Sequence, residues 1–215
     1  MLAVALVFAR VKLPEIGESP APDMQKESTG SRGLWKESTF TFGLVALFLY
    51  VAAQTGINSF FINYATETAG ISAHEASVWL SFGGMGLFMA GRMGGSWLMR
   101  SVRAEKVLTA CAVGAVASMA AVILLPGKAG WYGLLCCFLC ESVMFPTIFA
   151  LALRKTGRNT KRASSFLIMS IVGGAIAPVL MGIIADTSSM AAGFSVPLVC
   201  FVVIAVYAYK YKSLR

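Results

Sequence analysis

The chain has 215 residues, of which 57% are hydrophobic and only 13% are charged. Soluble domains carry about 25% charged residues, so most of this chain is expected to lie in a lipid bilayer. The net charge of +8 comes from short basic runs between apolar segments and not from a single cluster of basic and aromatic residues. That distribution argues against nucleic-acid binding.

The part of the chain before the first long apolar segment divides in two. Residues 1–9 are apolar but too short to cross a bilayer, and no basic segment precedes them as in a signal peptide. We expect them to be the tail of a preceding membrane helix. Residues 10–41 are polar and rich in Pro, Gly and Ser, which predicts a linker.

Six segments after the linker are apolar enough to span a hydrocarbon core, which needs about 20 residues. They are residues 42–65, 76–99, 107–126, 131–153, 164–185 and 195–209. The sixth is the shortest, and it ends in tyrosines of the kind found at membrane interfaces. The sequence therefore predicts an all-α membrane protein with a six-transmembrane-helix bundle over residues 42–215.

The placement of basic residues predicts the orientation of this bundle. All of the eighteen Lys and Arg residues except Arg92 and Lys128 lie in the linker, in the second or fourth connection, or at the C-terminus. These regions share one side of the membrane if all six segments cross it. Under the positive-inside rule, the linker and the C-terminus are cytoplasmic.

The five cysteines all lie within apolar segments. Cys137 and Cys140 form a Cys-x-x-Cys pair, a spacing that can carry redox or metal chemistry. No second pair and no nearby histidine accompany them, so we interpret them as packing residues and expect no metal site. No nucleophile–base pair or phosphate-binding loop is recognisable, and the chain is not expected to be an enzyme.

A carboxylate lies near the middle of the fourth span, where Glu141 precedes Pro146 by five residues. A charged group at the bilayer centre costs roughly 2.5–3.5 kcal/mol on insertion scales, and such residues usually face a cavity. Glu141 therefore favours a transport protein over a plain membrane anchor. Three roles stay open for it: it could bind substrate, carry a proton, or sit protonated in a helix contact.

The two halves of the bundle share a faint internal similarity. Ser81-Phe-Gly-Gly in the second span corresponds to Ser170-Ile-Val-Gly-Gly in the fifth. The first and fourth spans both carry polar residues near mid-membrane. Three helices followed by three in the opposite orientation is the inverted-repeat plan of many secondary transporters, and we expect it here.

Several short stretches resemble the C-terminal half of a major facilitator superfamily transporter, and specifically the L-fucose permease group of sugar–proton symporters. They are Tyr50-Val-Ala-Ala-Gln-Thr-Gly-Ile-Asn-Ser-Phe-Phe61, Gly91-Arg-Met-Gly-Gly-Ser96, Phe145-Pro-Thr-Ile-Phe149, and Ser164-Ser-Phe166 through Gly173-Gly174 to Asp186. Their order and spacing match helices seven to twelve of that family.

This resemblance implies a sugar cavity between two six-helix halves that opens alternately to either side of a bacterial inner membrane. It implies a proton as the coupling ion and no cofactor. The family's coupling acids lie in the N-terminal half, which this sequence does not contain, so we expect the chain to be inactive without that half. The chain could be a truncated product or one piece of a split transporter. The alternative is a stand-alone six-helix module with an interaction or regulatory role.

Sugar hydroxyls need side chains that both donate and accept hydrogen bonds. Gln54 and Asn58 are four residues apart and hence share a helix face, where they could bind a sugar or hold helices together. Asn63 is a further candidate nearer the outer end of the span, and Phe145 is either a stacking face for a sugar ring or a packing residue.

The resemblance also implies a cytoplasmic gating motif formed by Gly91, Arg92 and Arg100. We interpret Arg92 as an ionic latch in preference to a substrate ligand. Helix flexibility during transport is expected at four positions, although static packing explains the glycines nearly as well. These positions are Pro146, Gly173, Gly174 and Pro178.

Overall fold

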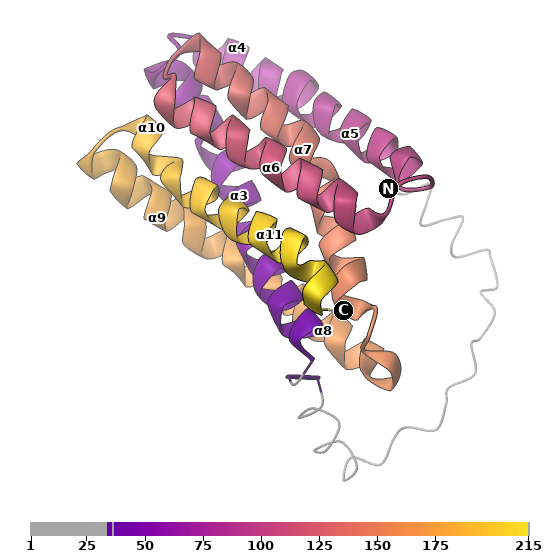
Figure 1. Ribbon diagram of the computed structural model, residues 1–215. Helices are drawn as coiled ribbons and strands as arrows, with labels where there is room; N and C mark the ends of the chain where they lie inside the picture. Colours follow the sequence, from indigo (N-terminus) through magenta and orange to yellow (C-terminus); the bar gives the residue numbers. More distant parts are fainter. Residues whose placement is uncertain (1–33, 36, 215) are drawn as a thin grey trace, which may run out of the picture.

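The computed structural model describes residues 34–35 and 37–214, without the side chains of residues 158 and 212–214, and those residues form no β-strand. The expected tail at residues 1–9 and most of the expected linker at residues 10–41 lie outside this description. The remainder is a bundle of helices (Figure 1).

The first triplet of membrane helices consists of α3 (Ser38–Glu67), a rod made of α4 (Ala73–Val78), η2 (Trp79–Gly84) and α5 (Met85–Leu98), and α6 (Ala104–Leu124). The second triplet begins with α7 (Lys128–Leu153). It continues through η3 (Gly157–Asn159), α8 (Thr160–Met169), η4 (Ser170–Val172) and α9 (Gly173–Thr187), and it ends with α10 (Met190–Gly193) and α11 (Ser195–Leu214).

Five helical runs in the described chain are long and apolar enough to cross a membrane. They are α3, α6, α7, Thr160–Thr187 and Met190–Tyr211. The second predicted span, at residues 76–99, is not among them. It is helical from residue 73 to 98, but the π-helix η2 divides it, and several glycines together with Arg92 make it less apolar than the others.

The turn between the two triplets follows from its sequence. Pro126 cannot continue α6, which ends at Leu124. Gly127, at φ +108°, then starts α7 in a conformation that residues with a side chain rarely adopt. A turn this short needs no long loop, so the antiparallel helices α6 and α7 pack directly against each other.

The two triplets pack on each other reciprocally. α3 and α7, the first helix of each triplet, are in contact (Figure 1). α5 and α6 pack on α7, whereas α9 and α11, the corresponding helices of the second triplet, pack on α3. This exchange is what an inverted repeat with approximate two-fold symmetry produces, so the expected arrangement of three helices plus three is confirmed.

The internal similarity in the sequence coincides with irregular helix in both triplets. The Gly-Gly pair of the first triplet ends the π-helix η2, and that of the second triplet begins α9 directly after the 3-10 turn η4. Departures from α-helix of this type often mark hinges or functional sites. Both second helices thus change their winding at the corresponding place.

Candidate functional site

A proline inside α7 leaves a backbone carbonyl without its usual partner. Pro146 has no N–H, so it cannot donate to the carbonyl oxygen of Ser142 one turn earlier. Arg92 Nε of α5 donates to that oxygen instead, at 3.1 Å. Because Ser142 is buried, its carbonyl oxygen would otherwise stay unpaired, so this side chain stabilises the helix at Pro146.

Glycine is what allows Arg92 to reach this position. A Cβ atom at Gly91 would overlap the side chain of Ser142 and lie 2.7 Å from the carbonyl oxygen of Leu139. A Cβ atom at Gly95, one turn later, would likewise overlap the side chain of Val143 of α7. The guanidinium of Arg92 also sits 4.9 Å from the centre of the Phe88 ring, a cation–π distance, while the residue as a whole remains exposed.

Glu141 is fully buried, next to this bend. Its backbone carbonyl accepts a hydrogen bond from the Tyr50 hydroxyl of α3 at 3.0 Å. Its carboxylate Oε1 is 3.5 Å from Cys137 Sγ, a weak donor, and Oε2 has no partner. No described cation forms an ion pair with it. The expectation that this carboxylate faces an open cavity is therefore not met in this conformation, since the helices of the bundle enclose it.

The amides of α3 continue the face that begins at Tyr50. Tyr50, Gln54 and Asn58 are spaced four residues apart, and Gln54 and Asn58 are half-buried. Asn58 Nδ2 donates to the backbone carbonyl of Gln54 at 2.9 Å, and its Oδ1 is buried without a partner. Asn63 lies apart from this row and is exposed.

Phe145 takes part in aromatic packing. Its ring centre is 5.9 Å from that of Tyr50 and 6.2 Å from that of Phe149, with which it stacks. It joins the α3–α7 contact, and the structure places it beside Tyr50 and not beside the amides. Tyr50 was not among the predicted site residues, although its position four residues before Gln54 marks the same helix face.

The remaining predicted positions lie in two parts of the bundle: the turn after α5, and the contact between α9 and α3. Arg100 is exposed in the turn after α5, two turns from Arg92, and makes no ion pair in the described chain. Gly173 lies against the carbonyl oxygen of Phe48, and Gly174 lies against Thr55, so both hold α9 close to α3. The structure thus gives the two glycines a packing role, and the gating and flexibility roles stay predictions.

The cysteines and His74 do not form a metal site within the described residues. All five cysteines are free, and no group of three or more His, Cys, Asp or Glu residues able to hold a metal occurs in the described chain.

The chain is similar in sequence to sugar transporters of bacteria. It is 33% identical to a glucose/galactose transporter of Brucella abortus over 95% of the chain and 49% of that protein. It is also 33% identical to the L-fucose-proton symporter of Escherichia coli K12 over 99% of the chain and 50% of that protein. No protein-family model matches it.

A solved structure shows the same fold. FucP, a major facilitator superfamily transporter crystallised in the outward conformation, superposes with a TM-score of 0.88 and 32% identity over 98% of this chain. The chain is homologous to one half of these major facilitator superfamily transporters. It spans about half the length of the relatives it matches, and the similarity covers 51% of FucP. Its reciprocal triplets are consistent with the C-terminal half of the superfamily fold.

Proposed function

We propose that this chain forms the C-terminal half of a sugar–proton symporter that carries L-fucose or a related hexose such as glucose or galactose. It works by alternating access, rocking against a second six-helix bundle like the other half of its relatives. It acts without enzymatic chemistry, in a bacterial inner membrane, with its linker and C-terminus cytoplasmic. The proposed substrate class, hexose sugars, is that of the glucose/galactose and L-fucose transporters to which the chain is similar.

The exposed guanidinium of Arg92 is the observation that carries this proposal. The residue lies about two turns before α5 ends at Leu98, and it is exposed although its Nε bonds the Ser142 carbonyl and its guanidinium lies over the Phe88 ring. Lipid contact with a charged group inside a membrane helix is costly, and such residues usually face a wet cavity or a protein neighbour. A companion bundle that encloses an aqueous cavity supplies both.

The sugar is bound by the α3 amides in this proposal. Gln54 and Asn58 offer donors and acceptors on one face, and the buried Asn58 Oδ1 lacks a partner that a hydroxyl donor could supply. Glu141 binds a proton in addition to the coupling acids that the resemblance assigns to the other half. A buried carboxyl that no described cation neutralises is expensive to keep ionised, and the weak donor Cys137 Sγ is the one hydrogen-bond partner of this carboxyl among the described residues.

Transport in proteoliposomes tests this function. The chain alone, under an imposed proton gradient, is expected to accumulate no L-fucose, glucose or galactose. A fusion that places the N-terminal half of the E. coli L-fucose-proton symporter before it is expected to take up at least one of these sugars. Gln54→Ala and Asn58→Ala should abolish that uptake, whereas Asn63→Ala on the exposed position should leave it unchanged.

Two results would contradict the proposal. Proton-driven uptake by the chain alone would show that no second half is needed. A fusion that inserts and folds, as judged by its thermal stability, but moves none of the three sugars would remove the assigned substrate class.

A further inference from the structure

A groove runs along the outside of the bundle between the beginning of α6 and the end of α11. It has a volume of about 790 Å³ and is lined by Arg103, Lys106, Ala110, Val113 and Tyr209, among others. A second hollow of about 440 Å³ shares Val113 and Tyr209 with it, which makes the two continuous. Each volume falls within the roughly 300–1,000 Å³ range of sites for small molecules.

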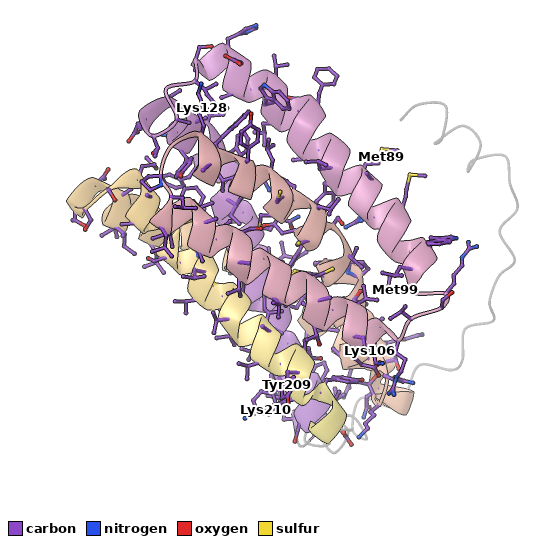
Figure 2. The ribbon with its side chains drawn as sticks, turned by 45° about the horizontal axis from the view of Figure 1, so that its top comes forward. Met89, Met99, Lys106, Lys128, Tyr209 and Lys210 are labelled. Carbon is purple, nitrogen blue, oxygen red and sulfur yellow. The ribbon has the colours of Figure 1, made fainter. Side chains whose placement is uncertain are left out.

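The groove lies away from the candidate sugar site. The sugar-site residues belong to α3, α5 and α7, whereas the groove belongs to α6 and α11. Lys106, Tyr209 and Lys210 lie at one end of the bundle, and Lys128 lies at the other (Figure 2). Because α6 begins at Ala104 and α11 ends at Leu214, this end of the groove is at the boundary between membrane and water.

The mouth of the groove carries positive charge that the residues described by the structure do not neutralise. Its one carboxylate, Glu105, is already engaged, 3.5 Å from Arg103 Nε and 3.1 Å from Arg154 Nη1. Lys106 and Lys210 are exposed and have no hydrogen-bond or ion-pair partner within the described residues. Two ammonium groups are therefore available to an anion from outside the chain.

Below the charged mouth the groove is apolar. Ala110 and Val113 of α6 line it, and Val202 and Val206 of α11 continue it toward the membrane interior. Tyr209, 80% exposed, lies between the lysines and this trough, the level at which tyrosines mark a membrane interface. The order from water inward is thus cation, aromatic ring and hydrocarbon.

We propose that this groove binds one anionic phospholipid of the surrounding membrane. The lipid phosphate contacts Lys106 and Lys210, its glycerol region lies beside Tyr209, and one acyl chain fills the trough along Val113. Basic pockets between membrane helices recognise anionic headgroups in this way. A free phosphate would leave the apolar trough empty, so the ligand is the intact lipid.

Native mass spectrometry of the full chain in a neutral detergent tests the site. Phosphatidylglycerol is expected to bind more tightly than phosphatidylcholine with the same acyl chains. Lys106→Gln and Lys210→Gln should each weaken phosphatidylglycerol binding by roughly fivefold and leave phosphatidylcholine unchanged. Lys128→Gln, at the other end of the bundle, is the matched control and should change neither.

A second variant tests the acyl-chain trough. Val113 is 57% exposed, so Val113→Trp fills the groove without disturbing the core. It should weaken binding of long-chain phosphatidylglycerol and leave the dihexanoyl form, which has almost no tail to place, unaffected. Thermal melting of each variant checks that it is folded.

Four results overturn the inference. The first is equal binding of the two lipids by the unmodified chain. The second is an undiminished preference in a folded variant that lacks both lysines, and the third is competition by inorganic phosphate at the same concentration as the lipid. A dimer that Val113→Trp dissociates would also overturn it, because a second copy would then occupy the groove.

Discussion

Arg92 Nε donates to the carbonyl oxygen of Ser142, the oxygen that Pro146 leaves without a helical donor. This relationship explains three features of the sequence together. The proline bends α7, the arginine repairs the bend from α5, and Gly91 lets the two helices approach closely enough for the bond to form. It also gives Arg92 a structural role in addition to the ionic latch expected from the sequence.

A double-mutant cycle tests the coupling between Arg92 and Pro146. Arg92→Met removes the donor and should lower the free energy of unfolding by about 1–3 kcal/mol, because the Ser142 oxygen is left unpaired. Pro146→Ala restores a backbone N–H, so in that background Arg92→Met should be milder by about 1 kcal/mol or more. SDS unfolding titrations measure all four proteins. Equal effects of Arg92→Met in both backgrounds would show that the arginine does not serve this carbonyl.

Two neighbouring glycines of α5 should respond oppositely to alanine. Gly91→Ala places a methyl group against Ser142 and the Leu139 carbonyl, so it should destabilise the bundle by about 1–3 kcal/mol. Gly94 has nothing within 4 Å of its Cβ position, and Gly94→Ala should stabilise the helix by about 0.5–1 kcal/mol. Thermal melting in a mild detergent distinguishes them. A similar shift for both variants would mean that α5 does not pack on α7 as described.

Buried tyrosine hydroxyls provide a second matched pair. Tyr64 of α3 donates to the carbonyl oxygen of Val122 at 2.9 Å, an oxygen that Pro126 cannot serve, whereas the buried Tyr207 hydroxyl has no partner among the described residues. Tyr64→Phe should cost about 0.6–1.5 kcal/mol in unfolding free energy. Tyr207→Phe should be neutral or stabilising, because it removes an unpaired polar group. The same unfolding titration checks both, and the reverse order of stabilities would refute the assignment.

Glu141→Gln probes how the buried carboxyl is held. The amide keeps the shape of the side chain and can still accept from Cys137, and no ion pair is lost. Its unfolding free energy at neutral pH should therefore be equal to or higher than that of the unmodified chain. Glu67→Gln, on an exposed carboxylate, should stay within about 0.5 kcal/mol. A loss of about 3 kcal/mol or more in Glu141→Gln would reveal a buried ion pair.

Much of the architecture could be predicted from consecutive residues. Three features depend on local sequence, because bilayer insertion acts on each segment separately. They are the apolar segments of membrane length, the helix break at Pro126 and Gly127, and the placement of Lys and Arg. The second span was also predicted, at residues 76–99, but the π-helix η2 that divides it was not.

The candidate site was predicted in part. The shared face of Gln54 and Asn58 follows from helix periodicity, and it is present in the structure. The position of Glu141 along α7 could also be predicted from the sequence. Its burial could not, because burial depends on how Tyr50 and the rest of α3 cover it. Asn63, with the same side chain as Asn58, lies apart because five residues of α-helix turn it to another face.

The sequence by itself determined that this chain is a multi-spanning membrane protein and which side chains each helix carries, because hydropathy and helical period are properties of neighbouring residues. Only the tertiary structure decided which helices meet: that α5 packs on α7 and α9 on α3, that Arg92 reaches the Ser142 carbonyl, and that Glu141 is enclosed. These outcomes depend on the rotation and crossing of helices that are far apart in the chain. Both are set by close packing at Gly91, Gly95 and Gly174.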